Sequence, residues 1–478
     1  MKKPFLGRER ESHEFQQLLD RTDATLVTCQ GRRRIGKSRF IHTCAKKADH
    51  FYAFMGLPPR EGITKQSQLD AFSEQIADQT KAPRVPLDSW YTAFRLLDSQ
   101  LPGKGKIVIL LDEISWLAIG DPDFSGHLKT AWDTLFSHHS RLMLVLCGSV
   151  SSWIEKNVLN NTGFVGRCTW QFKLAPLPLP KCHEFWGRRK SRVSSAEKLR
   201  MLAVTGGVPR YLEEIDPKLS AEQNIEKLCF NSSGLLFNEF NQIFHDIFNR
   251  KAPAYREIVR ALVTGRGSVS KLSKSLKRIR GGTLSSALTE LEQSGFIRKD
   301  VSFDPETAKP RPRAVRYRLS DNYLRFYLRY IEPVRSQIES GLYQQAPVET
   351  FRAWDTIMGL QFENLILENL PAMLAIAGLD KTPMLNAGPF YQAATKRKKG
   401  CQIDLMLRSR QSLYIFEIKF RKRIQKSVIG DVQRKVDNLS PSRSLAIRTG
   451  LIYEGTLDSE IEKSDYFDYL IPFDAFLK

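Results

Sequence analysis

Short apolar runs alternate with amphipathic segments along the first third of the chain. Short apolar stretches occupy 24–29, 51–55, 107–111 and 142–147, and the first of them is rich in β-branched residues. Continuous apolar runs of this length are typical of strands that are buried on both faces of a parallel sheet. Residues 66–80 instead have the period of an amphipathic helix. The alternation of the two patterns predicts an α/β fold for this region.

The segment after the first apolar run carries a phosphate-binding pattern. Residues 31–38 read Gly-Arg-Arg-Arg-Ile-Gly-Lys-Ser, which fits G-x-x-x-x-G-K-[S/T]. Its glycines permit the backbone angles that bring successive N–H groups against an anion. Lys37 is expected to reach the β- and γ-phosphates of ATP, and the Ser38 hydroxyl to bind Mg²⁺. The expected nucleotide-binding residues are Gly31, Arg32, Arg33, Arg34, Ile35, Gly36, Lys37, Ser38 and Arg39.

Two acids follow the third apolar run, at the end of a strand where ligands bind in open α/β sheets. Asp112 suits the Mg²⁺ shell, and Glu113 suits a group that polarises the attacking water. The fourth run ends in Cys-Gly-Ser, so Ser149 either touches the γ-phosphate or the water, or is an ordinary helix N-cap. Arg167 is either a catalytic finger toward the nucleotide of a neighbouring copy in a homo-oligomer, or a surface arginine.

These motifs occur in order between Gly7-Arg8-Glu9 and the segment 205–212, which reads Thr-Gly-Gly-Val-Pro-Arg-Tyr-Leu. Over residues 1–235 the sequence resembles the archaeal-type ATPase family, a branch of the AAA+/STAND P-loop NTPases. The resemblance implies an ATP site made by residues 31–38, Asp112 and Glu113, with a small helical lid after Pro176. The run of three arginines at 32–34 departs from the family pattern, although such charge is tolerable beside phosphates.

The pattern changes near residue 254, where three short helical segments precede two strand-like ones. Helices are expected at 254–264, 268–276 and 283–294, and strands at 296–301 and 315–319, which together predict a winged helix-turn-helix. Residues 251–330 hold 18 Lys and Arg against 7 Asp and Glu, so they suit the phosphates of double-stranded DNA. A protein-contact module is the alternative. The expected phosphate contacts are Lys271, Lys274, Lys277, Arg278, Arg280, Arg311, Arg313, Arg316 and Arg318.

A second constellation of charged residues lies in the last third of the chain. Glu363 falls in a helical stretch with an apolar surround, and Asp404 in a strand-like run at 401–407. In the next run Glu417 and Lys419 share one face, because side chains alternate along a strand. Asp404 and Glu417 are therefore the expected ligands of a Mg²⁺ ion, and the Lys419 ammonium would stabilise a pentavalent phosphate.

The order Glu363, Asp404, Glu417-Ile-Lys419 resembles the PD-(D/E)XK nuclease superfamily over residues 345–440. The resemblance implies a restriction-endonuclease-like α/β domain that cuts phosphodiesters, and it adds Gln433 on the next helix to the catalytic residues. Asp404 follows an isoleucine where the superfamily often has proline. An edge strand with alternating charge is the alternative, but the run is mostly apolar, so burial of Glu417 and Lys419 needs a reason.

Composition extends this picture to the whole chain. The 478 residues include 73 Lys and Arg and 52 Asp and Glu, a balance that favours a polyanionic partner. No apolar run approaches membrane-spanning length, and the 7 cysteines lack metal-ligand spacing, as is typical of reduced cytosolic thiols.

The sequence thus predicts a cytoplasmic, ATP-dependent and Mg²⁺-dependent DNA-processing protein with four parts. These are a P-loop ATPase domain at 1–175, a helical lid at 176–248, a winged helix at 249–340 and a nuclease-like domain at 341–478. Two alternatives stay open: a switch that binds ATP and DNA without cutting, and a transcription regulator with a degenerate nuclease fold.

Overall fold

The computed structural model describes residues 5–149, 151–248, 252–276, 281–344, 346–396, 399–439 and 444–478. Three of the expected DNA contacts, Lys277, Arg278 and Arg280, lie outside these residues. The chain divides into two compact units, residues 1–176 with 243–250, and residues 177–242 with 251–478. No helix in the described ranges combines the length and the apolar character needed to cross a membrane.

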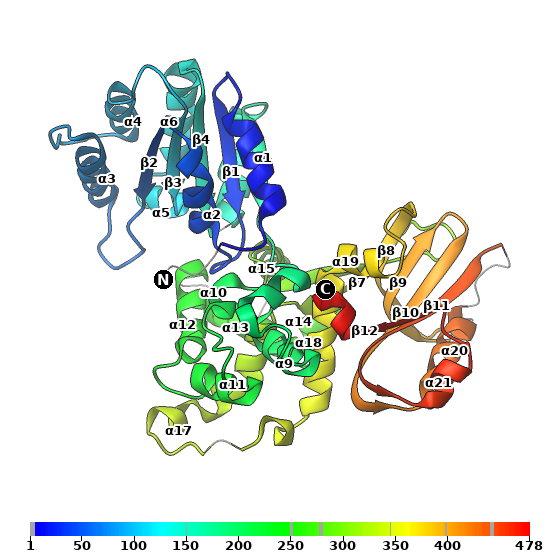
Figure 1. Cartoon of the computed structure of the whole chain (residues 1–478). Helices are drawn as coiled ribbons and strands as arrows, with labels where there is room; N and C mark the ends of the chain where they lie inside the picture. Colours follow the sequence, from blue (N-terminus) through cyan, green and yellow to red (C-terminus); the bar gives the residue numbers. More distant parts are fainter. Residues whose placement is uncertain are drawn as a thin grey trace. The chain divides into compact units, whose positions relative to one another are not determined.

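A five-stranded parallel sheet forms the centre of the first unit, in the order β2-β3-β4-β1-β5 (Figure 1). Every residue of β1, β3 and β4 is buried, because apolar clusters cover both faces of the sheet. This burial explains the continuous apolar runs, which do not alternate with polar residues. The elements are α1 Glu9–Leu19, β1 Thr25–Gln30, α2 Lys37–Cys44, η1 Ala45–Lys47, β2 His50–Met55, α3 Lys65–Thr80, α4 Trp90–Ser99, β3 Ile107–Asp112, α5 Ile114–Leu117, α6 Phe124–Thr134, η2 Phe136–His138, β4 Leu142–Gly148, α7 Ser151–Ile154, η3 Glu155–Leu159, η4 Thr162–Phe164 and β5 Cys168–Lys173.

The second unit begins with short helices and continues with three helices and an antiparallel hairpin, β6 with β7. These last elements occupy the places that the sequence pattern predicted, although β7 begins at Pro310 rather than at 315. The helices and strands up to the hairpin are α8 Leu179–Cys182, η5 His183–Arg189, α9 Ser195–Thr205, α10 Pro209–Leu212, α11 Ala221–Cys229, α12 Leu235–Phe248, α13 Ala252–Ala261, α14 Val269–Ser275, α15 Gly281–Gln293, β6 Ile297–Phe303 and β7 Pro310–Leu319.

A mixed five-stranded sheet closes the second unit, in the order β12-β11-β10-β9-β8. The first three of these strands run parallel, whereas β9 is antiparallel to β10 and β8 is antiparallel to β9. Helix α20 connects β10 to β11 and buries Val428, Val432 and Leu439. Phe303 of the hairpin packs in the same apolar core as Phe390 of the sheet, so the hairpin and the sheet share one core.

The remaining elements are the five strands of this sheet and the helices before, between and after them. They are α16 Asn322–Phe326, η7 Tyr327–Ile331, η8 Glu332–Val334, α17 Arg335–Glu339, η9 Val348–Thr350, α18 Trp354–Glu368, α19 Leu370–Ile376, β8 Met384–Gln392, β9 Cys401–Ser409, β10 Ser412–Ile424, α20 Ser427–Leu439, β11 Ala446–Leu457, α21 Ser459–Lys463, β12 Tyr469–Pro472 and η10 Phe473–Leu477. Helix α18 packs against β10, which places the Glu363 helix beside the strand of Glu417 and Lys419.

Candidate functional site

The phosphate loop joins β1 to α2 and is shaped by its two glycines. Gly31 has φ 154°, and a Cβ atom there would lie 2.6 Å from the carbonyl oxygen of Leu174. Gly36 has φ 87° and stands directly before α2, so the helix N-terminus opens onto the loop. Between them Arg34 has φ 69°, and the Ile35 N–H donates to the Arg32 carbonyl over 3.4 Å. Ser38 and Arg39 lie in the first turn of α2, as a phosphate cradle requires.

The Lys37 ammonium is buried in this loop and is held by three oxygen acceptors. It donates to the carbonyls of Gly31 at 3.0 Å and Arg32 at 3.3 Å, and to the Ser149 hydroxyl at 3.2 Å. A lysine ammonium has three donors, so this set satisfies it without a carboxylate. The loop therefore keeps a full positive charge at the place where the pattern expects phosphate.

Glu113 is tied to the same network through Ser149, which follows the neighbouring strand β4. The Ser149 hydroxyl donates to one Glu113 oxygen at 2.6 Å, and its N–H donates to the other at 3.2 Å. Glu113 has φ 47° and ψ 52°, an uncommon backbone conformation for a residue with a side chain. Asp112 is buried at the end of β3, where its carboxylate accepts the Glu113 N–H at 3.0 Å. The structure thus brings Lys37, Asp112, Glu113 and Ser149 together at one end of the sheet.

Two further arginines of the first unit are held by partners within it. Arg167 forms a two-pronged pair with Asp133, at 2.6 and 2.9 Å, so a finger role would require that pair to open. Arg8 of the Gly-Arg-Glu segment is buried and donates to the carbonyls of Ala175 at 2.6 Å and Ile35 at 3.4 Å. This segment therefore contacts the backbone of the phosphate loop.

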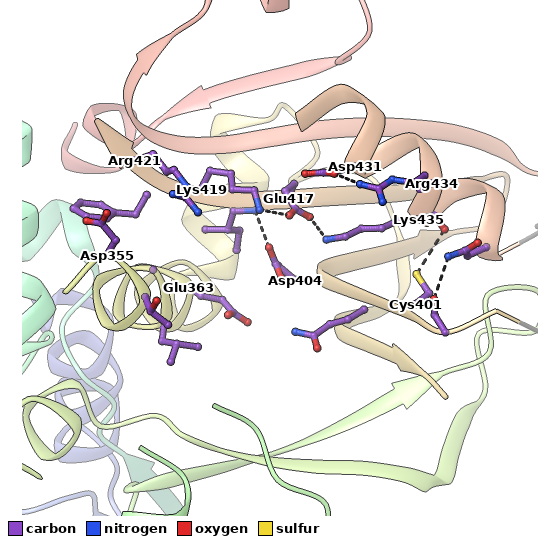
Figure 2. A pocket seen from close by; sticks show the side chains of 18 residues that line it. Asp355, Glu363, Cys401, Asp404, Glu417, Lys419, Arg421, Asp431, Arg434 and Lys435 are labelled. Carbon is purple, nitrogen blue, oxygen red and sulfur yellow. Dashed lines mark hydrogen bonds and ion pairs between the residues drawn. The ribbon is translucent and has the colours of Figure 1, made fainter. Parts of the chain in front are cut away.

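The second unit contains a pocket of about 860 Å³ in the C-terminal sheet. Four of the predicted nuclease residues line it: Glu363 from α18, Asp404 from β9, and Glu417 and Lys419 from β10. Figure 2 shows their side chains turned into the same space. Since Leu405 pairs with Phe416 across the antiparallel strands, the next pair, Asp404 and Glu417, lies on one face of the sheet. Both carboxylates therefore line one pocket.

Glu417 is almost fully buried and is neutralised from both sides. One carboxylate oxygen pairs with the Lys419 ammonium at 2.6 Å and the other with the Lys435 ammonium at 2.5 Å. Burial, and then the charges of Glu417 and Glu363, raise the pKa of the adjacent Asp404 carboxyl to about 7. Burial alone would lower the pKa of Lys435, but the charges of Asp404 and Glu417 raise this pKa above its usual value.

Lys435, which the sequence reasoning missed, occupies the place that was assigned to Gln433. Gln433 is exposed, does not line the pocket, and bonds to Asp437 at 2.8 Å and to the Tyr466 hydroxyl at 3.1 Å. The signal was present in the spacing: Lys435 follows the buried Val428 by two helical turns, on the stripe that faces the sheet. A residue two positions earlier on a helix points to a different face.

The hairpin arginines are more engaged than the sequence suggested. Arg318 is buried and pairs with Asp300 at 3.2 Å, which removes it from the expected phosphate contacts. Arg311 pairs with Asp304 at 2.7 Å, and the Arg316 guanidinium lies 3.2 Å from the centre of the Tyr391 ring. Among the remaining expected contacts in the described ranges, Arg313, Lys271 and Lys274 are exposed.

The donor set of the pocket fits a divalent cation that keeps part of its water shell. Within the described residues no group of three or more His, Cys, Asp or Glu side chains is arranged to hold a metal. Mg²⁺ is nevertheless usually bound through one or two carboxylates and several waters, and the two adjoining strands supply two carboxylates. Burial, and then the charges of Glu417 and Glu363, raise the pKa of Asp404, and a bound cation would lower this pKa again.

Comparisons with known proteins support the phosphate-loop site of the first unit. Residues 5–215 match the model of an ATPase domain predominantly from Archaea, and residues 327–430 match a model of archaeal and bacterial proteins of unknown function. An uncharacterized protein of Methanocaldococcus jannaschii is 23% identical over 438 residues, which cover 90% of this chain and 91% of the relative.

Two solved structures are also similar in part. The Walker-type ATPase of Pyrococcus abyssi aligns with a TM-score of 0.49 and 19% identity, over 68% of this chain and 96% of that one. The ORC2 protein of Aeropyrum pernix, solved in ADPNP–ADP complexes, aligns with a TM-score of 0.40 and 13% identity, over 71% of this chain and 97% of that one. The match over 5–215, together with the loop geometry, makes the N-terminal part of the chain a P-loop ATPase domain that binds ATP.

Proposed function

We propose that the chain is an ATP-hydrolysing, DNA-processing protein whose C-terminal pocket is a Mg²⁺-dependent nuclease. The observation that carries the proposal is the convergence of Glu363, Asp404, Glu417 and Lys419 in one pocket, although they come from one helix and two strands. Burying a carboxylate such as Glu417 costs free energy even when lysines pair with it, and phosphodiester cleavage uses both kinds of group.

In the ATPase domain each residue around the loop has a distinct role. The Lys37 ammonium would exchange its carbonyl and hydroxyl acceptors for phosphate oxygens, and Ser38 and Asp112 would hold Mg²⁺. Glu113 would orient and polarise the attacking water. Ser149 already bonds both Lys37 and Glu113, so a contact between its hydroxyl and the γ-phosphate would change both of these hydrogen bonds. Arg8 would support the loop from behind through the Ile35 carbonyl.

In the pocket Asp404 and Glu417 would hold the metal, which when bound supplies an activated water and charge stabilisation. Glu417 is kept in place by two ammonium groups, so a metal ligand of one fixed orientation is available. When the Glu417 charge is shared with a metal, the Lys419 ammonium becomes free to stabilise charge on the scissile phosphate.

Double-stranded DNA is the substrate class that the charges around the pocket support. Arg421 and Arg434 line the pocket beside the acids. Helix α14 presents Lys271 and Lys274 to solvent, and we interpret α13, α14, α15 and the hairpin as a winged helix. Such side chains contact phosphate rather than base edges, so they would position DNA without reading its sequence.

The test is incubation of the full chain with plasmid and with linear DNA, each with and without Mg²⁺ and ATP. Asp404→Ala should lower Mg²⁺-dependent cleavage on the order of 10³-fold, since it removes a metal ligand. Asp474→Ala is the matched control, because that carboxylate pairs with Lys478 outside the pocket, and it should cut at the wild-type rate.

A second function is favoured by one observation, the neutralisation of Glu417 by two lysines. The charge of Glu417 is then balanced without a metal, as it would be in a protein that binds ATP and DNA but does not cut. Retarded migration of DNA with no cleavage in any arm of the assay, with or without Mg²⁺ and ATP, would replace the nuclease with this regulatory switch.

A further inference from the structure

Helix α18, which brings Glu363 to the pocket, is held by three arginines from the segment before it. Arg325 donates to the Gln361 side chain at 2.8 Å, and Arg318 donates to the Asn364 side chain at 2.5 Å. Between these two contacts, Arg266 forms an ion pair with Glu363. One carboxylate of the proposed catalytic pocket is therefore already paired with a cation from outside the C-terminal sheet.

The position of Arg266 is fixed by its own surroundings. It lies in the loop between α13 and α14, and the next residue, Gly267, exchanges two backbone hydrogen bonds with Tyr317 of β7, at 2.9 and 2.8 Å. The Arg266 guanidinium also lies 3.5 Å from Asp300, which in turn pairs with Arg318. The side chains of Arg266, Asp300 and Glu363 are 8%, 10% and 14% exposed, so solvent screens their charges little.

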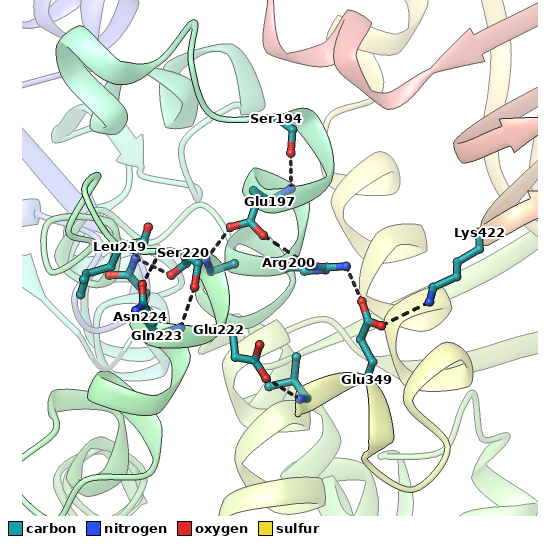
Figure 3. A network of polar contacts seen from close by, with 12 residues as sticks. Ser194, Glu197, Arg200, Leu219, Ser220, Glu222, Gln223, Asn224, Glu349 and Lys422 are labelled. Atoms are coloured by element: carbon teal, nitrogen blue, oxygen red, sulfur yellow. Dashed lines mark hydrogen bonds and ion pairs between the residues drawn. The ribbon is translucent and has the colours of Figure 1, made fainter. Parts of the chain in front are cut away.

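A second polar network differs from this one because its ion pairs are more exposed to solvent. In Figure 3 Glu349 joins Arg200, at 2.5 Å, to Lys422, at 3.3 Å. Lys422 is 90% exposed there, and exposed pairs of this kind contribute little. The Arg266–Glu363 pair differs because it is buried and because its acid lines the pocket that also contains Asp404 and Glu417.

We propose that Arg266 is a positioning residue of the pocket, which holds the Glu363 carboxylate in an ion pair and keeps it from serving as a third metal ligand. This inference rests on the proposed function, since it assumes a metal at Asp404 and Glu417. Mg²⁺ and Mn²⁺ prefer anionic oxygen ligands. Lys419 is 32% exposed and can leave Glu417 when a metal binds, whereas the Arg266 guanidinium is 8% exposed and stays against Glu363. Arg266 thereby sets the metal affinity of the pocket from a loop that is bonded to the hairpin.

The test is calorimetric titration of the full chain with Mn²⁺ alone, without DNA or nucleotide. Arg266→Gln should bind Mn²⁺ about tenfold more tightly than wild type, because a buried positive charge near the metal is removed. Arg266→Lys keeps the charge and should stay close to wild type. Arg311→Gln is the matched control, since Arg311 pairs with Asp304 of the hairpin instead, and its affinity should not change.

A double variant distinguishes positioning from mere proximity of charge. Glu363→Gln alone leaves Arg266 with Asp300 as its remaining acid and should weaken Mn²⁺ binding about tenfold, whereas Arg266→Gln combined with Glu363→Gln should return to the wild-type affinity. If the double variant stays as weak as Glu363→Gln, then Glu363 is a ligand in the wild-type protein and the assignment is overturned. The double variant leaves no charge unpaired, so it also replaces Arg266→Gln if that variant does not fold.

The remaining outcomes separate this inference from the proposed function. Equal Mn²⁺ affinity of Arg266→Gln and Arg311→Gln would overturn the role of Arg266, while binding that is lost in Asp404→Ala would leave the metal site standing. If wild type shows no Mn²⁺ binding that depends on Asp404, the metal site itself fails, and the role of Arg266 fails with it.

Discussion

Lys37 in the phosphate loop and Lys419 in the C-terminal pocket both lie beside carboxylates, but different partners hold them. The Lys37 ammonium bonds to two backbone carbonyls and a hydroxyl, and the nearest acid of its network, Glu113, is reached only through Ser149. Lys419 pairs directly with Glu417, which Lys435 pairs from the other side. One site therefore presents an unneutralised cation, and the other presents a carboxylate that is neutralised twice.

The two arrangements favour ligands of different charge. A lysine held by neutral acceptors keeps its full charge for an anion, and the helix N-terminus beside it adds to the same field. A pocket in which lysines already balance a carboxylate must exchange partners before a cation or a phosphate can bind. We expect the Lys37 ammonium to exchange only neutral acceptors for phosphate oxygens, whereas a metal in the pocket must compete with two lysines for Glu417.

The largest effect is expected at Lys37. Lys37→Ala removes the cation of the loop, and loss of a charge-assisted bond worth about 3 kcal/mol lowers ATP affinity at least about 100-fold. Titration with a fluorescent ATP analogue measures this. Lys106→Ala is the control, because that lysine forms a partly exposed pair with Asp20, and it should bind ATP as wild type does. Near-normal affinity in Lys37→Ala would show that the Lys37 ammonium does not hold the phosphates of ATP.

Glu113 should separate ATP binding from ATP turnover. Glu113→Gln preserves the shape of the side chain and an acceptor for Ser149 but removes the base, so we expect hydrolysis to fall about 100-fold or more while ATP affinity changes little. Phosphate release under single-turnover conditions measures the chemical step. Turnover at the wild-type rate would remove Glu113 from the mechanism and leave Asp112 as the acid that acts in this domain.

Lys435 and Gln433 lie on one helix and offer a sharp test of the pocket. Lys435→Ala exposes one side of Glu417 and should lower Mg²⁺-dependent cleavage about 10- to 100-fold, as is usual for residues that orient a metal ligand. Gln433→Ala removes an exposed residue outside the pocket and should leave cleavage within about twofold. Gel assays on linear DNA, with thermal unfolding as a check on folding, decide between the two. The reverse result would show that the sequence resemblance locates the helix residue better than the fold does.

The same pair of residues shows how far the sequence could be read. The strands of the first sheet and the phosphate loop could be predicted because their signals are local: an apolar run, two glycines and a lysine at fixed spacing. Glu417 and Lys419 could be placed on one face because strand alternation is also local. Asp404 joins them only through the pairing of β9 with β10. Lys435 required knowledge of which face of α20 meets the sheet, and an amphipathic stripe gives that only once the buried residues are identified.

Contacts between distant segments were beyond the reach of pattern alone. Arg266 and Glu363 are separated by 97 positions, and nothing in either local sequence indicates the other. Arg318 was expected on the surface because the segment is rich in arginine, but Asp300 on the paired strand neutralises it in the interior. Charge counts predict a basic region well, whereas they do not distinguish a solvated arginine from a buried, paired one.

Lysines that belong to neither site give the smallest and last test. Lys271 and Lys274 are exposed on α14. Salt therefore screens their interaction with phosphate more than it screens the interactions of the buried Lys37. Changing both to Gln should weaken DNA binding by about tenfold and reduce the slope of log affinity against log salt by roughly 1 for each lysine, with no change in sequence preference. Fluorescence anisotropy at several salt concentrations measures the slope.

Lys46 and Lys47, changed to Gln together, supply the control, since they lie in η1 of the first unit. If the slope is unchanged in the α14 variant and the affinity is intact, the segment from α13 to the hairpin contacts protein rather than DNA, and the basic charge of the middle region serves another partner.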